Sequence, residues 1–185
     1  MSPAAWIAGS ELPWQRLVAF GPSGFEAYAR LRFLPDPVYA GQSEADVDED
    51  APPEHDLLRT ALDVLTQHTG TSDECYFCLW DGWGLTVEPD GPKVVVPGRA
   101  YFLFRGSLSS FGDWGAADLS PGLPRSYMPD PAFIWPADHA WCVAKDVDPH
   151  YAGIGAAAAA IDDLLAEPSL DVVPADSHQE PPHYD

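Results

Sequence analysis

The sequence predicts an α+β fold, with a largely antiparallel sheet and two main helices packed on it at about residues 57–69 and 155–166. Two observations lead to this prediction. Short apolar runs of strand length recur along the chain, and Pro and Gly separate them. The two helical segments lie far apart and do not alternate regularly with the strands, which favours an antiparallel sheet over repeated βαβ units.

The first part of the chain predicts a hairpin, an acidic loop and a helix. Residues 14–20 and 25–33 have the alternation of strands, and the second should have one buried and one solvated face. Residues 41–56 are rich in Asp and Glu and lack periodicity, which indicates a mobile acidic loop. The helix at 57–69 is expected from one apolar stripe, formed by Leu57, Leu58, Ala61, Leu62 and Leu65.

The rest of the chain predicts a series of short strands and one more helix. The expected strands lie at 75–80, 93–96, 99–106, 141–147 and 170–173. Residues 107–130 are rich in Gly and Pro, which predicts a long irregular excursion over the surface. The alanine-rich run after Gly155 predicts the second helix. We therefore expect one domain over residues 1–173 and a disordered, acidic and proline-rich tail over residues 174–185.

The charge of the chain restricts its partners. The 185 residues include 9 basic and 29 acidic ones, for a net charge of −20, and 46% of the residues are hydrophobic. This apolar fraction is sufficient for a packed core. Nucleic acids and anionic membranes should be repelled, because binding them requires clustered Lys and Arg. A basic protein is the partner that this charge favours.

The sequence indicates a cytoplasmic protein. Its first residues contain no basic segment followed by a long apolar run, which a secretory signal would need. No apolar stretch approaches the roughly 20 residues of a membrane-spanning helix. The three cysteines are an odd number, which fits a reducing compartment better than a disulfide framework.

Catalytic motifs are absent from the sequence, and neither a cofactor nor a metal site is predicted. Cys75 and Cys78 have CxxC spacing, but on a strand these side chains point to opposite faces, and we interpret all three cysteines as buried apolar residues. A group of acidic residues and histidines is more typical of turns than of a metal or acid–base site. Whether its members converge in space stays open: Asp138, His139, Asp146, Asp148 and His150.

Tryptophans and charged residues in two aromatic segments are the candidate binding residues. Tryptophan clusters are found both in cores and on recognition surfaces, and the sequence leaves these alternatives open. The arginines on the strand at 99–106 could pair with an aspartate, as a structural contact or as a ligand clamp. The candidate binding residues are Trp80, Asp81, Trp83, Arg99, Arg105, Trp135, Asp138 and Trp141.

Several of these motifs resemble a family of hypothetical proteins from actinobacteria. The resemblance is carried by Trp-Asp-Gly-Trp-Gly at 80–84, by the segment 97–106, and by Trp-Pro-Ala-Asp-His-Ala-Trp-Cys-Val-Ala at 135–144. It covers most of the chain outside the acidic loop and the tail, and it implies no activity. A looser likeness, at Trp83 and Gly84, is to the SUKH-type immunity proteins of bacterial toxin systems, which are small acidic α+β proteins.

We therefore expect a non-enzymatic, acidic and cytoplasmic binding protein. Its most specific form would be an immunity or inhibitor protein that neutralises a basic protein partner. The alternative is an enzyme or small-ligand protein, which binds a metabolite or a metal in a pocket lined by tryptophan and aspartate. The partner and the oligomeric state cannot be obtained from the sequence.

Overall fold

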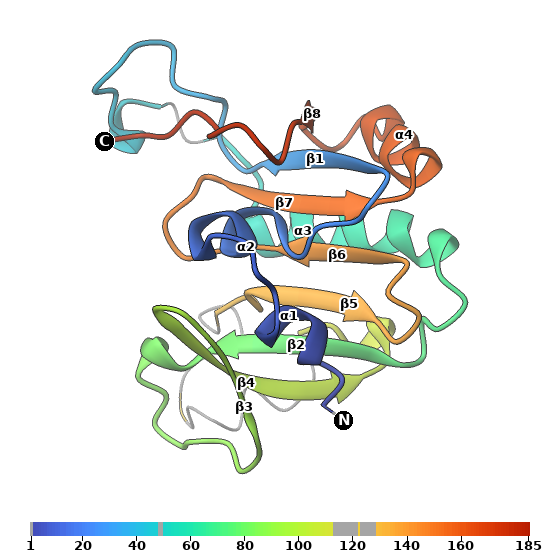
Figure 1. Cartoon of the computed structure of the whole chain (residues 1–185). Coiled ribbons are helices and arrows are strands. Elements are labelled where there is room, and N and C mark those ends of the chain that lie inside the picture. Colours follow the sequence, from blue (N-terminus) through green and yellow to red (C-terminus); the bar gives the residue numbers. More distant parts are fainter. Residues whose placement is uncertain (1, 48–49, 113–121, 123–128) are drawn as a thin grey trace.

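The fold is built on one antiparallel sheet, as a computed structural model shows (Figure 1). The structure describes residues 2–47, 50–112, 122 and 129–185. Within them the sheet has 8 strands in the order β3-β4-β2-β5-β6-β7-β1-β8, and every strand pair is antiparallel. The strands are β1 (Ala27–Arg32), β2 (Cys75–Trp80), β3 (Lys93–Val96), β4 (Arg99–Gly106), β5 (Phe133–Pro136), β6 (Trp141–Ala144), β7 (Tyr151–Ala156) and β8 (Val172–Ala175).

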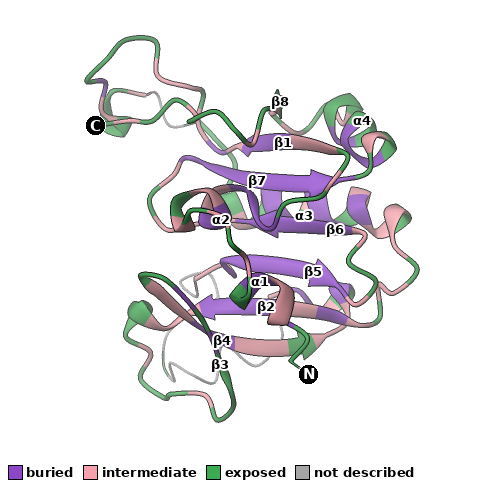
Figure 2. Cartoon of the chain, viewed as in Figure 1, coloured by how far each residue is buried: buried purple, intermediate pink, exposed green. Residues whose placement is uncertain are grey.

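Helices cover both faces of the sheet, so that each face has its own apolar core. On one face α3 (Glu54–Leu65) and α4 (Ala158–Ala166) pack against side chains such as Leu31 and Ile154. On the other face lie α1 (Ala5–Ala8) and α2 (Trp14–Phe20), in front of the sheet in Figure 1. The central strands β5, β6 and β7 are buried throughout (Figure 2), because both of their faces are covered.

Much of the sequence prediction is confirmed. The α+β class and the antiparallel sheet are correct, and β2, β3 and β4 have the predicted bounds. The first predicted helix corresponds to α3 and the 3-10 turn that continues it, η2 (Thr66–His68). The strand expected at 141–147 ends at Ala144, and the last strand lies at 172–175 instead of 170–173.

The predicted strand at 14–20 is wrong, because these residues form helix α2. A run of seven residues can fit both the two-residue alternation of a strand and the 3.6-residue period of a helix. Here Trp14, Leu17 and Val18 have the i, i+3, i+4 spacing of a helix. Leu17 and Val18 are buried against the sheet in the helical form. Since Pro13 directly precedes the helix, it removes only an N–H that a helix start leaves unpaired.

The second predicted helix begins three residues too early. Residues 151–156 form strand β7, and α4 begins at Ala158. Two glycines let neighbouring segments approach this strand. A Cβ on Gly153 would lie 2.0 Å from the carbonyl oxygen of Ala19 in α2, and one on Gly155 would lie 2.4 Å from the ring of Phe25. Gly153 therefore allows close packing of α2 on the sheet, and Gly155 does the same for the segment that contains Phe25.

The structure describes the tail and most of the acidic loop. Residues 44–46 of the loop form a 3-10 turn, η1 (Glu44–Asp46), and residues 54–56 belong to the first turn of α3. Residues 174–175 are part of β8, and residues 176–185 run beside the segment 36–46 (Figure 1). The excursion predicted at 107–130 lies largely outside the described residues; its described part includes a 3-10 turn, η4 (Leu108–Ser110).

Candidate functional site

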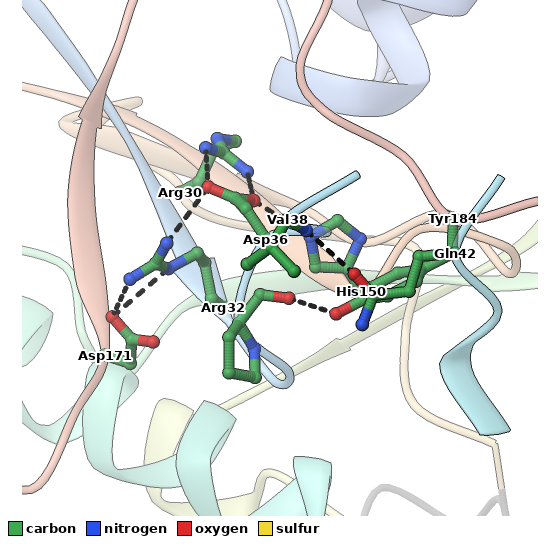
Figure 3. Close-up of polar contacts among 9 residues, drawn as sticks. Arg30, Arg32, Asp36, Val38, Gln42, His150, Asp171 and Tyr184 are labelled. Carbon is green, nitrogen blue, oxygen red and sulfur yellow. Dashed lines mark hydrogen bonds and ion pairs between the residues drawn. The ribbon is translucent and has the colours of Figure 1, made fainter. Parts of the chain in front are cut away.

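A buried ion pair lies where β1 ends. Arg30 is on the strand face that the sequence predicted to be solvated, but its side chain is only 9% exposed. It donates two hydrogen bonds to the carboxylate of Asp36, at 2.7 and 2.9 Å, as Figure 3 shows. The expected solvated face is therefore wrong at this position, because Asp36 folds back over the strand and neutralises the guanidinium.

Arg32 and His150 complete this polar cluster around Asp36. Arg32 lies 3.0 Å from the Asp36 carboxylate and 2.7 Å from that of Asp171, which follows α4 in the chain. His150 Nε2 lies 3.0 Å from Asp36 Oδ1, and the imidazole is almost fully buried. The hydrogen bonds from Arg30, supported by those from His150 and Arg32, hold the pKa of Asp36 well below its ordinary value. Asp36 is therefore a stable anion that joins three segments of the chain.

Aromatic rings surround the polar cluster. The Arg30 guanidinium lies over the ring of Tyr151, at 5.1 Å from its centroid. The His150 ring meets Tyr151 and Tyr184 edge to face, at centroid distances of 5.5 and 4.9 Å. Tyr184 belongs to the tail, and its hydroxyl donates a hydrogen bond to the carbonyl oxygen of Pro35. The cluster therefore contacts two tyrosine rings, one from β7 and one from the tail.

Next to the cluster is a groove of about 410 Å³, which we call the acidic groove. Its carboxylates come from Glu44, Asp146, Asp148 and Glu180, and its aromatic residues are Trp14, Tyr151 and Tyr184. It is further lined by Gln15, Val18, Ala19, Pro149, His150, Pro181, Pro182 and His183. Carboxylates beside aromatic faces suit a cation, which gains ion pairing from the former and cation–π contact from the latter.

An arginine between two tryptophans contacts two residues that line the acidic groove, Trp14 and Asp146. The Arg99 guanidinium lies 5.5 Å from the ring centroid of Trp14 and 5.2 Å from that of Trp80, and it pairs with Asp146 at 3.3 Å. Trp83, which is 44% exposed, packs edge to face on Trp80 at 5.6 Å. Asp81, in the 3-10 turn η3 (Asp81–Trp83), pairs with Lys93 at 3.2 Å.

The structure thus brings Trp80, Asp81, Trp83 and Arg99 together, but it separates the other predicted binding residues from them. Trp135 and Trp141 have no exposed surface and belong to the cores on opposite faces of the sheet. They therefore cannot line one pocket, as the alternative hypothesis of a Trp- and Asp-lined site would require. The indole N–H of Trp141 donates to the carbonyl oxygen of Leu65 at 3.1 Å, as expected for a core tryptophan.

Asp138 and Arg105 have structural contacts away from the acidic groove. Asp138 accepts hydrogen bonds from the Thr69 hydroxyl and from the N–H of Gly70, both at 2.8 Å, and so holds the loop after η2. Its pKa is lowered by these hydrogen bonds, despite the opposing effect of desolvation, which is the largest single influence. Arg105 is 65% exposed and pairs with Glu74 at 3.0 Å.

The group of acidic residues and histidines divides between the two ends of β6. Asp146, Asp148 and His150 line the acidic groove after the strand ends. Asp138 and His139 precede the strand, and His139 stacks on Trp6 at 4.1 Å. Among the described residues, no set of His, Cys, Asp and Glu side chains has the geometry to hold a metal ion.

The cysteines are poor nucleophiles. Cys75, Cys78 and Cys142 are all free and buried, as the sequence predicted. Burial raises the pKa of Cys75 to about 12, and it raises those of Cys78 and Cys142 as well. Because the thiolate is the reactive form, these residues act as core side chains at neutral pH.

The sequence names Asp146, Asp148 and His150 as a group, but it does not reveal the other residues of the acidic groove and of the polar cluster beside it. Its patterns predict a strand at Trp14, a solvated face at Arg30 and Arg32, and a disordered tail at Tyr184. The sequence does contain one signal, since Asp36 lies between Pro35 and Pro37 directly after a strand with two arginines. Such a turn can fold the carboxylate back onto the strand.

No family model matches the chain, and neither a curated protein nor a solved structure matches it. The resemblances to actinobacterial hypothetical proteins and to SUKH-type proteins remain hypotheses. Within the described residues, no helix has the length and apolar character to cross a lipid bilayer.

Proposed function

We propose that the chain is a cytoplasmic binding protein without catalytic activity, and that its acidic groove receives a basic segment of a partner protein. One observation carries this proposal. Glu44 and Asp148 line the groove with exposed side chains, and neither of them has an ion-pair partner among the described residues. A Lys or Arg side chain from a partner would supply the missing cation.

The surroundings of these carboxylates support the same proposal. Trp14 and Tyr151 also line the groove, so that a guanidinium or ammonium there would have both carboxylates and aromatic rings as neighbours. Arg99, between Trp14 and Trp80, is an example of this arrangement within the chain itself. The interface would extend from the groove over Arg99 to the exposed Trp83, with aromatic anchors of the kind that dominate binding energy.

The net charge of −20 supports a basic partner through the rate of association. A strongly acidic protein attracts a basic one over distances of about 10 Å at ordinary ionic strength, and salt screens this attraction. Inhibition of a basic toxin, in the manner of an immunity protein, is the most specific form of the proposed function. The free thiols of the three cysteines are compatible with a reducing cytoplasm.

Two charge-reversal variants test the proposal. Asp148→Lys places a cation in the groove, whereas Asp162→Lys makes the same change in net charge at an exposed position on α4, which packs on the other face of the sheet. We expect a basic partner to be captured from cell extract at low salt by the unmodified chain and by Asp162→Lys, but not by Asp148→Lys. High salt should release the partner. Equal capture by the two variants would exclude the groove as the binding site.

A further inference from the structure

One side of the acidic groove is formed by the chain's own C-terminal residues. Pro181, Pro182 and Tyr184 of the tail form one of its walls, opposite Trp14 and Tyr151. The segment reaches this position from β8, after it has passed Arg16, whose guanidinium donates to the carbonyl oxygen of His178 at 2.7 Å. The tail therefore lies against an aromatic surface that is otherwise built by α2 and by the residues before β7.

Residues 180–185 are attached mainly through the last two of them. The Tyr184 hydroxyl donates to the Pro35 carbonyl oxygen, and the Tyr184 ring packs on His150 (Figure 3). The Asp185 N–H donates to the carbonyl oxygen of Gln42 at 3.0 Å. Residues 180–183 have no hydrogen bond to any other described residue, so only side-chain packing holds them in the groove. Such an attachment costs little free energy to release.

The composition of the tail shows what kind of segment the groove accommodates. Two consecutive prolines favour an extended polyproline conformation, which loses little entropy on binding. Aromatic-lined grooves are the usual sites for such segments. The tail has one unfavourable feature, because Glu180 adds a carboxylate to a groove that already contains Glu44, Asp146 and Asp148. A cation at that position would have opposite charges as neighbours.

We propose that residues 180–185 are a resident ligand of the acidic groove, and that a proline-containing segment of a partner displaces them when it carries Lys or Arg beside the prolines. This inference rests on the proposed function, and it adds the chemistry of the partner segment and the means by which the free protein covers its site. Displacement exchanges one proline segment for another, and it replaces a repulsive carboxylate with an attractive cation.

The test compares the full chain with its Tyr184→Ala variant, which loses the ring on His150 and the hydroxyl bond to Pro35. The probe is the peptide Arg-Pro-Pro-His-Tyr-Asp, titrated by calorimetry. A tail that occupies its site in most molecules reduces the apparent affinity of a competitor, so we expect the variant to bind the probe at least about fivefold more tightly. The control is Leu165→Ala, at an exposed position on α4, which packs on the other face of the sheet; it should leave the affinity of the probe unchanged.

Two further peptides test the chemistry of the segment. Glu-Pro-Pro-His-Tyr-Asp, which repeats the tail, should bind Tyr184→Ala more weakly than the arginine peptide does. Arg-Gly-Gly-His-Tyr-Asp should lose most of the affinity, because the glycines must be ordered on binding. The inference would be overturned if Arg-Pro-Pro-His-Tyr-Asp and Arg-Gly-Gly-His-Tyr-Asp bound with equal affinity. It would also be overturned if the unmodified chain and Tyr184→Ala bound Arg-Pro-Pro-His-Tyr-Asp with equal affinity.

The outcomes separate this inference from the proposed function. If a basic partner is captured in a manner that depends on Asp148, but Tyr184→Ala changes neither capture nor peptide affinity, the groove binds its partner and the tail is not its competitor. If Asp148→Lys has no effect on capture and no peptide binds to either form, both proposals fail.

Discussion

The strongest prediction concerns Asp36, which joins Arg30, Arg32 and His150. Replacing it by Asn keeps the volume of the side chain but removes the charge and one of two acceptor oxygens. Arg30 then remains as a buried cation, because its side chain is only 9% exposed. Breaking a buried ion pair by removing one partner costs about 3 to 5 kcal/mol of unfolding free energy. Since Asp36 is itself 23% exposed, we expect the lower end, about 3 kcal/mol.

A matched variant supplies the control for this prediction. Asp171→Asn makes the same chemical change at the other carboxylate of Arg32, which is 46% exposed. An exposed ion pair of this kind contributes about 0 to 1 kcal/mol. Urea unfolding followed by tryptophan fluorescence measures both variants. Equal losses for Asp36→Asn and Asp171→Asn would refute the assignment of Asp36 as the charge that neutralises Arg30.

The pH dependence of the Asp36→Asn effect follows from the lowered pKa of the carboxyl group. A group whose folded-state pKa is depressed stabilises the fold fully above its unfolded pKa, which is about 3.9 for aspartate. This stabilisation is lost as the pH falls from there through the folded-state pKa. The difference in unfolding free energy between the unmodified chain and Asp36→Asn should therefore be constant from about pH 7 down to about pH 5, roughly one unit above the unfolded pKa, and it should shrink below about pH 4.

The remaining predictions concern the core. Trp141→Ala should cost about 3 to 5 kcal/mol in urea unfolding, whereas the exposed Trp83→Ala should cost less than about 1 kcal/mol; similar losses would contradict their placement in core and surface. The thiols should not react with a thiol reagent before unfolding, and stability should fall above about pH 8.5, where the unfolded cysteines ionise first. Gly153→Ala should prevent folding or strongly destabilise the fold, because the new Cβ would lie 2.0 Å from a backbone oxygen. Gly70→Ala should fold normally, since its Cβ would lie 3.7 Å from the nearest side-chain atom. Circular dichroism measures both outcomes.

The secondary structure of a short segment could be predicted from the sequence where its apolar residues had the spacing of only one element, helix or strand. The helix stripe from Leu57 to Leu65 is an example, because its apolar residues match only the spacing of a helix. The segments 14–20 and 151–156 could not be predicted in this way, since a short apolar run fits both a helix and a strand. Their conformation depends on packing between them, where Gly153 meets the backbone of α2.

In the candidate site, too, some contacts are local in the sequence and others depend on the tertiary structure. Trp80, Asp81 and Trp83 lie on one strand and the turn after it, so their proximity is local, whereas Arg99 reaches them through the pairing of β2 with β4. The acidic groove joins α2, the residues after β6 and the tail, which are far apart in the chain. No local pattern encodes such a meeting, because it arises from the order of strands in the sheet.

By itself, the sequence determined the α+β class, the acidity that favours a basic partner, and the apolar character of the cysteines. These properties depend on composition and on spacing within single elements. Only the tertiary structure decided that Trp135 and Trp141 are core residues, that Arg30 is buried against Asp36, and that the tail lies in the groove. The physical reason is that burial and charge pairing depend on which distant segments fold onto a side chain, and the same tryptophan or arginine suits a core or a surface until that contact is known.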